Sequence, residues 1–301
     1  MTRPAPRSID QYLGQLHDAL HGEDPALVQD ALYDAEEYLR AEVAQHPGKS
    51  EADVLELIAS TYGAPDEVAE AYRTTEKTVR EALKPHAPPL RTSRLGRFFG
   101  VYSDSRSWMA LFYMLLALAT GIFYFTVAVV GLSMSAGLAF LIIGIPFFLL
   151  FIGFTRILSL VEGRIVEGLL GVRMPRRPVR SAQGTTLGAR IRDMLLDRRT
   201  WTTLLYLFVM LPIGIFDFTV AITGLAVSLA FILAPVAQVL HALGLGTEGV
   251  QINGWYAPWP VTLLLLPLGV LLLTGLLHAA RAIGIAHGAL ARALLLSRDG
   301  E

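Results

Sequence analysis

One run of the chain constrains its fold more than any other feature. No charged residue occurs among the 49 residues between Arg106 and Arg156. An α-helix rises about 1.5 Å per residue and needs about 20 apolar residues to cross roughly 30 Å of hydrocarbon. The run is therefore long enough for two membrane crossings. Small residues over 131–137 favour a turn, so we predict spans at roughly 108–130 and 137–155.

Two further apolar stretches follow, one from Trp201 and one over roughly 259–280. The segment 226–240 contains Pro235, so it is either a continuation of span three or an outer interfacial helix; a fifth crossing is the rival interpretation. Residues 156–200 hold ten arginines, whereas 131–136 and 240–258 hold no Lys or Arg. Because basic loops stay cytoplasmic, we expect four spans with both termini in the cytoplasm.

The membrane part contains an internal repeat. A shift of 93 residues places Asp104, Arg106 and Trp108 on Asp197, Arg199 and Trp201. A larger shift places Arg156, Gly163 and Leu170 on Arg281, Gly288 and Leu295. We interpret 94–170 and 188–298 as two helical hairpins that both enter from the cytoplasm. The fold class predicted is all-α, with parallel repeats in the membrane domain 94–301.

Each copy opens with a short amphipathic segment, 97–106 or 190–199, that ends in Asp-x-Arg-Ser/Thr-Trp. A charged face, an apolar face and a boundary tryptophan are typical of a helix in the membrane interface. Anchoring alone is one interpretation. The other is that ion pairs within each segment, Asp104 with Arg106 and Asp197 with Arg199, transmit the tilt of the hairpin to the cytosol.

Asp217 is the charge that the sequence places inside a predicted span, and it aligns with Tyr124 in the other copy. A carboxylate there costs roughly 2.5 to 3.5 kcal/mol on insertion scales, so it should face the bundle interior with a partner. We expect that partner to be Tyr124, with Thr126 and Thr219 as nearby polar residues. A structural hydrogen bond, proton or ligand sensing, and ion passage all fit. His287, near the inner end of span four, is expected at the lipid headgroups.

Charge divides the chain into two parts. Residues 1–90 hold 17 acidic and 8 basic side chains (net −9), and residues 91–301 hold 9 and 17 (net +8). The cytoplasmic loop 171–187, with Arg173, Arg176, Arg177 and Arg180, is predicted to be mobile and attracted to anionic lipid, at about 1 kcal/mol per charge. The acidic part is a second candidate for docking there.

Residues 1–83 are predicted to form a cytosolic four-helix bundle. Helix starts are marked by Ser8, by Asp24 before a proline, and by Ser50, residues that accept hydrogen bonds from the first free amides of a helix. Apolar residues at helical spacing follow each start. A proline-rich linker, 84–93, then joins the bundle to the membrane domain.

The bundle and the elbow motifs resemble two known families. The pattern of Tyr12, Leu16, Gly63, Pro65 and Tyr72 resembles the HAAS-type helical signalling domain. The repeated Asp-x-Arg-Ser/Thr-Trp elbow with paired hairpins is similar to the "putative sensor" membrane domain found on bacterial histidine kinases. The resemblance implies a signalling protein of the bacterial inner membrane. It also implies a partner such as a PadR-type regulator, an ABC transporter or a two-component protein.

Several activities lack the residues that they need. There is no cysteine, Walker A sequence, His-Glu-x-x-His or Gly-x-Ser-x-Gly motif, so we expect neither an enzyme nor a cofactor. His17 and His21 have no third ligand placed by sequence, so no metal is predicted. Direct nucleic-acid binding is not expected either.

Two functional hypotheses remain. The first is a non-enzymatic membrane sensor or regulator that contacts lipid and relays a signal through the bundle. The alternative is a small transporter, channel or lipid-handling protein that uses Asp217. The spacing Gly284-x-x-x-Gly288 allows close helix approach, which fits either a homodimer seam or packing within one chain.

Overall fold

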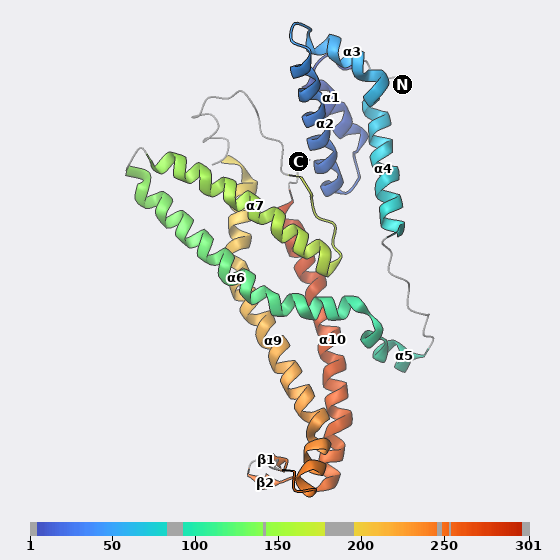
Figure 1. Cartoon of the computed structure of the whole chain (residues 1–301), viewed down its shortest axis with the longest axis vertical. Helices are drawn as coiled ribbons and strands as arrows, with labels where there is room; N and C mark the ends of the chain where they lie inside the picture. The colour runs from blue at the N-terminus through green and yellow to red at the C-terminus, as the bar shows by residue number, and fades with distance from the viewer. Residues whose placement is uncertain are drawn as a thin grey trace.

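The computed structural model describes residues 5–82, 93–140, 143–177, 196–245, 249–252 and 254–296. These residues are almost entirely helical, which confirms the all-α fold class (Figure 1). The elements are α1 Ile9–Ala19, α2 Pro25–Gln45, α3 Glu51–Tyr62, α4 Pro65–Ala82, α5 Arg94–Phe99, η1 Gly100–Ser103, α6 Ser105–Gly137, η2 Leu138–Phe140, α7 Gly144–Leu170, α9 Arg198–Ala242, β1 Gln251–Ile252, β2 Trp255–Tyr256 and α10 Trp259–Leu295. Residues 84–92 of the predicted linker 84–93, and Arg180, lie outside the described residues.

Helices α1 to α4 form a small bundle, which we call the headpiece (residues 5–82). The predicted helix starts are correct: the side chains of Ser8, Asp24 and Ser50 accept hydrogen bonds from the backbone amides of Gln11, Ala26 and Asp53. Ser50 and Asp53 complete a reciprocal capping box. Local sequence therefore sets where the headpiece helices begin.

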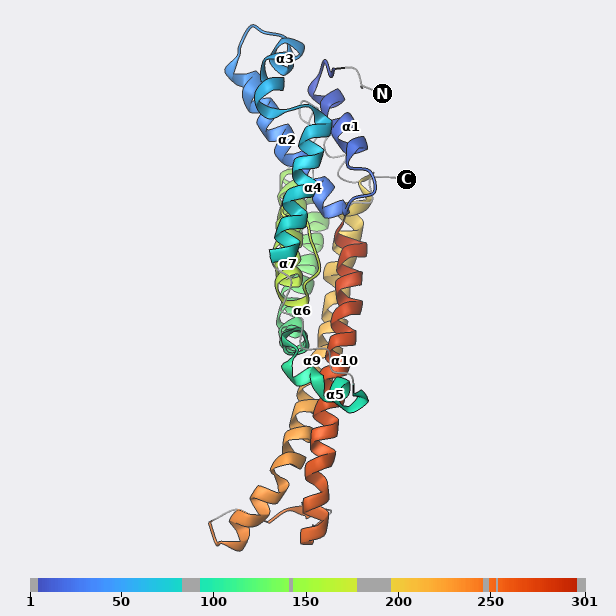
Figure 2. The same cartoon turned by 90° about the vertical axis from the view of Figure 1, so that its right-hand side faces the viewer.

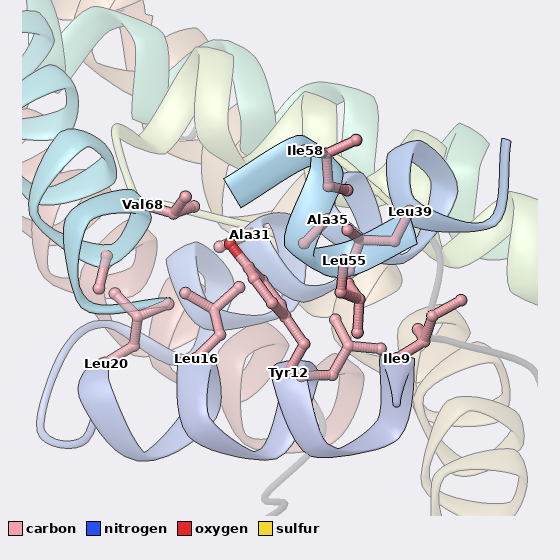
Figure 3. Close-up of a cluster of buried hydrophobic side chains, with 12 residues drawn as sticks. Ile9, Tyr12, Leu16, Leu20, Ala31, Ala35, Leu39, Leu55, Ile58 and Val68 are labelled. Carbon is pink, nitrogen blue, oxygen red and sulfur yellow. The ribbon is translucent and has the colours of Figure 1, made fainter. Parts of the chain in front are cut away.

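The residues singled out in the headpiece pattern build its core. Tyr12 and Leu16 project from α1 into a cluster with side chains of α2, α3 and α4 (Figure 3). The Tyr12 hydroxyl donates to the carbonyl of Gly63 (3.0 Å). Gly63 has a φ of +99°, which favours glycine over other residues, and it separates α3 from the helix that Pro65 begins. The Tyr72 hydroxyl donates to Asp34 of α2 (3.2 Å), so α4 is fixed to α2.

Among the described residues, three helices are long and apolar enough to cross a membrane: α6, α9 and α10. Their outward faces carry exposed large apolar side chains such as Phe112, Phe216 and Leu264. The fourth long helix, α7, packs against α6, and the count of four spans stays a prediction. Residues 226–240 belong to α9, which continues through Pro235 to Ala242. Of the interpretations considered for this segment, the continuation of span three is therefore the one that the structure shows.

The turn predicted at 131–137 is wrong, because α6 continues to Gly137 and α7 begins only at Gly144. The small residues support the helix instead of breaking it. Gly131 lies against the ring of Phe151, where an added Cβ would fall closer than 3.0 Å. The hydroxyl of Ser135 donates to the Gly131 carbonyl one turn earlier (2.7 Å). This hydrogen bond satisfies the hydroxyl within the helix, so the serine does not end it.

The orientation of the hairpins also differs from the prediction. Helices α6 and α9 run in opposite directions in both views (Figures 1 and 2). They pack at Gly121 and Gly214: Gly121 lies against the Met210 carbonyl, and Gly214 against the Ala117 carbonyl. A Cβ at either glycine would fall within 3.0 Å of that oxygen, so both are needed for the close approach. The described helices are therefore antiparallel, and the parallel arrangement is wrong.

Candidate functional site

A buried glutamate lies between the two hairpins. Glu162 of α7 has no exposed surface and accepts three tyrosine hydroxyls, each at 2.8 Å. Tyr113 and Tyr206 donate to its Oε1, and Tyr124 donates to its Oε2. An ionised carboxylate accepts hydrogen bonds only, with room for about four. Three donors from α6 and α9 thus satisfy a group that would otherwise be very costly to bury.

The second acidic group of this region is Asp217 of α9, which is 1% exposed. Its Oδ2 lies 3.6 Å from Nδ1 of His287, which is itself 4% exposed on α10. The imidazole packs edge-on against the ring of Tyr113, with centroids 4.7 Å apart, and its Nε2 is 3.4 Å from the Tyr206 hydroxyl. Asp217 therefore faces the interior as predicted, but its partner is His287 and not Tyr124. His287 is buried inside the protein, so it does not face the headgroups as expected.

These six residues, Tyr113, Tyr124, Glu162, Tyr206, Asp217 and His287, form what we call the buried polar centre. They occupy equivalent positions in the two copies. The 93-residue shift pairs Tyr113 with Tyr206 and Tyr124 with Asp217, and a shift of 125 pairs Glu162 with His287. Each copy therefore supplies one tyrosine, Tyr113 or Tyr206, and one interacting pair. The pair is Tyr124 with Glu162 in the first copy and Asp217 with His287 in the second.

Packing contacts obey the same equivalence. The contact of Gly131 with Phe151 corresponds to that of Gly224 with Leu276. Contacts that repeat at shifted positions are what an approximate two-fold relation between the hairpins would produce. The internal repeat itself stays a prediction that these contacts support.

The predicted intramembrane threonines do not join the centre. The hydroxyl of Thr126 donates to the carbonyl of Ile122 (2.8 Å), and that of Thr219 donates to the carbonyl of Ile215 (2.7 Å). Both are exposed, and each satisfies its hydroxyl within its own helix. Among the described residues, neither hydroxyl has a hydrogen bond to another helix.

The elbow aspartates make ion pairs that cross from one copy to the other. Asp104 and Asp197 cap α6 and α9 by accepting from the backbone amides of Arg106 and Arg199. This leaves their other oxygens free for distant partners: Asp104 pairs with Arg281, and Asp197 pairs with Arg156 (3.2 Å each). Each pair joins one copy to the other. The transmission of hairpin tilt through ion pairs within each elbow stays a prediction.

The tryptophans of the elbows are exposed. Trp108 donates its indole N–H to the Tyr102 carbonyl (3.0 Å), which ties the start of α6 to η1. Trp201 is also exposed, on the first turn of α9. Both side chains are therefore accessible for the boundary position predicted for them, and that position is a proposal.

Residues 171–177, which we call the basic segment, are packed against helices α7 and α10. The side chain of Met174 lies on Gly163, and Val172 lies on Gly288. Gly163 and Gly288 directly follow Glu162 and His287 in the chain. The expectation of a mobile loop is thus wrong for 171–177. Gly284 faces Ala110 and Leu170, so the small-residue spacing serves packing within the chain.

The basic segment binds the headpiece. Asp30 of α2 accepts the backbone amides of Arg176 and Arg177 at its Oδ1 (2.7 and 2.8 Å), and its Oδ2 pairs with Arg173 (2.9 Å). Arg173 also pairs with Glu76 of α4 (3.2 Å) and with Glu167 of α7 (3.4 Å). One guanidinium therefore connects two headpiece helices to the membrane domain.

Further contacts surround this one. Arg177 pairs with Asp34 (2.8 Å), and Arg292 of α10 pairs with Asp24 (2.9 Å). Arg199 donates to the Gln29 side chain (3.1 Å). The predicted docking of the acidic part on the basic part is present in the structure, and its role in signalling is a proposal.

Burial raises the pKa of Asp30 above its usual value, although the amides of Arg176 and Arg177 and the charge of Arg173 act in the opposite direction. The guanidinium of Arg176 has a raised pKa because its side chain bonds to Glu167. The Arg176 side chain is therefore used within the membrane domain (3.0 Å to Glu167), and only its backbone contacts Asp30.

Glu162 is the functional candidate that the sequence interpretation missed. It falls seven residues beyond the predicted end of span two, among charged residues that resemble a cytoplasmic loop. The 125-residue shift that aligns Arg156 with Arg281 also aligns Glu162 with His287. This alignment was the sequence signal that could have identified Glu162 as a counterpart of His287.

The fold and the buried polar centre define a helical membrane protein with an attached helical headpiece. A family model described as "Putative sensor" matches residues 113–295, more than half of the chain. The chain belongs to this family of sensor membrane domains. No curated protein and no solved structure matches it.

Proposed function

We propose that this protein is a non-enzymatic membrane sensor whose buried polar centre controls how tightly the headpiece is held. A condition of the bilayer or envelope changes the packing of α7 and α10 around Glu162 and His287. The headpiece is then released from the basic segment, or held on it, and passes the state to a partner. The family and the helices that can cross a membrane support a sensor role.

One observation carries the proposal: the two helices that supply Glu162 and His287 each reach the headpiece contact five residues further on, α7 through Arg173 and α10 directly. Glu167 follows Glu162 on α7 and binds Arg173, which holds Asp30. Arg292 follows His287 on α10 and binds Asp24. Five residues correspond to about 7.5 Å of helix, so a small shift at the centre displaces both contacts directly.

The test uses the absence of cysteine in the native chain. Cysteines at Gln29 and Arg199, whose side-chain ends meet in the docked form, report the docked headpiece through a bifunctional maleimide long enough to replace the two side chains, since a direct disulfide needs a closer approach of the backbones. Glu162→Gln removes the charge that three hydroxyls bind, and we expect crosslinking to fall at least threefold. Thr126→Val, which removes a hydroxyl that stays within its own helix, should leave it unchanged. Equal crosslinking in wild type and Glu162→Gln would contradict coupling between the centre and the headpiece.

The antiparallel hairpins give the second candidate function specific support, since inverted repeats with midplane polar sites are typical of transporters. The Oδ2 of Asp217 has no hydrogen-bond partner among the described residues. Ion flux or lipid scrambling in proteoliposomes that is lost in Asp217→Asn would favour a transporter, channel or lipid-handling protein. The absence of flux would favour the sensor.

The partner of the headpiece belongs to the proposal as well. A PadR-type regulator, an ABC transporter or a two-component protein is the expectation from the HAAS-like pattern. The bacterial inner membrane is the proposed location. Four spans with both termini cytoplasmic would require α6 and α9 to be parallel, so the antiparallel packing argues against that topology. A homodimer is a further proposal, now without the support of Gly284 and Gly288, which pack within the chain.

A further inference from the structure

The contact between the basic segment and the headpiece has the form of a bound peptide. The two oxygens of Asp30 bind different groups: Oδ1 accepts hydrogen bonds from two successive backbone amides, and Oδ2 pairs with the guanidinium of Arg173. Attraction between two charged surfaces would need no backbone contacts. Here the headpiece binds both the main chain of the segment and its side chains.

Two arginines of the segment have separate sites on the headpiece. Arg173 is 13% exposed and lies between Asp30 and Glu76. Arg177, four residues later, pairs with Asp34, and its guanidinium lies 5.8 Å from the centre of the Tyr33 ring. Arginine suits both sites, because its planar group pairs with carboxylates and lies over aromatic rings. Pro175, buried between them, fixes its own φ and so limits the conformations of the segment, which bends at Arg176 and Arg177.

We propose that this face of α2 and α4 is a peptide-binding surface and that residues 173–177 occupy it as a built-in ligand. When the headpiece is released, the surface binds an exposed segment of a partner protein that carries two arginines four residues apart. Acidic side chains line the surface, so anionic lipid and nucleic acid are excluded as occupants. The inference rests on the proposed function only for the event that releases the segment.

The tether explains why the site stays occupied. The headpiece and the basic segment belong to one chain, so the segment acts at an effective concentration of up to about millimolar, the value for a short flexible linker. A free peptide must compete with that concentration, so the intact protein should bind it weakly. Weakening the built-in ligand should open the site without altering the headpiece.

The experiment measures binding of a fluorescent peptide with the sequence of residues 171–178, GVRMPRRP, to the full-length protein in nanodiscs. The receptor variant Arg173→Ala with Arg177→Ala should bind it at least about tenfold more tightly than wild type. Adding Asp30→Ala to that variant should abolish binding, whereas adding Glu56→Ala, an exposed acidic residue of α3, should not. A scrambled peptide of the same composition should bind at least tenfold more weakly.

Two results would overturn the inference. One is equal weak binding by the wild type and the double arginine variant. The other is equal binding of the native and scrambled peptides, which would reduce the contact to net charge. Neither result touches the Glu162→Gln crosslinking test, and a failed crosslinking test would leave peptide binding intact. The two proposals can therefore fail separately.

Discussion

Replacing Arg173 with alanine tests whether docking depends on specific contacts or on the charge of the segment. Arg173 is 13% exposed and pairs with Asp30 and Glu76, which are 9% and 14% exposed. Its loss leaves two mostly buried carboxylates without their shared cation. Hydrogen bonds to charged groups contribute about 1.5 to 3 kcal/mol, and breaking a buried pair costs about 3 to 5 kcal/mol. Because these groups keep some solvent, we expect docking to weaken by about 2 to 4 kcal/mol.

That range corresponds to a loss of roughly 30- to 1,000-fold in the docking equilibrium, since 1.36 kcal/mol is a factor of ten. Spin labels on exposed Leu57 of α3 and Ile285 of α10 would report the docked and released populations by pulsed electron resonance. The released fraction gives the docking equilibrium directly.

Arg176 provides the matched control. It carries the same charge in the same segment, but its guanidinium binds Glu167 and its headpiece contact is made by the backbone amide. Arg176→Ala keeps that amide, so docking should change by less than about 0.5 kcal/mol, as for an exposed ion pair. Equal release in Arg173→Ala and Arg176→Ala would refute the specific contact and leave general attraction between charged surfaces.

Three further predictions concern stability. Gly121→Ala places a Cβ 2.6 Å from the Met210 carbonyl and should destabilise the membrane domain by about 1 to 3 kcal/mol, measured as thermal unfolding in detergent; Gly153→Ala, where a Cβ meets nothing within 4 Å, is the control. Asp197→Asn keeps the helix cap and removes the pair with Arg156, so it should cost under about 1 kcal/mol, and Asp197→Ala should cost about 1 kcal/mol more. Burial raises the pKa of Tyr62 to about 12, whereas the unfolded chain loses this proton near pH 10. The free energy of unfolding of the headpiece should therefore stay constant below pH 10 and decrease between pH 10 and about pH 12. Tyrosinate absorbance and circular dichroism measure the ionisation and the unfolding. Tyr62→Phe should reduce that fall.

The headpiece could be predicted from sequence because its determinants are local. Ser8, Asp24 and Ser50 accept hydrogen bonds from amides two or three residues away, so the sequence around each helix start contains the relevant partner. The inward position of Asp217 was predicted for a similar reason, since the cost of an intramembrane charge depends on its surroundings in one helix.

The buried polar centre could be predicted only in part, because its partners come from different helices. The small residues at 131–137 favour a turn, so span two is predicted to end at Thr155. Glu162 therefore falls outside the predicted span. A shift of about seven residues in the start of α7 decides whether that glutamate is buried. The choice of His287 over Tyr124 as the partner of Asp217 depends on the register of α9 against α10.

The direction of the repeats is not contained in the alignment that reveals them. The 93-residue shift that aligns Gly121 with Gly214 shows that the two positions are equivalent, but it does not show how their helices pack. The capping role of Asp104 and Asp197 likewise follows from the start of each helix, whereas their pairs with Arg281 and Arg156 require the assembled hairpins.

The central claim is that the buried polar centre controls the headpiece, and the spin-label distance between Leu57 and Ile285 tests it most directly. In Glu162→Gln and in His287→Ala, we predict a released population that the wild type lacks, of the same distance as that produced by Arg173→Ala. If both variants keep the wild-type distance while Arg173→Ala changes it, then the centre is structural and the headpiece is held independently of it.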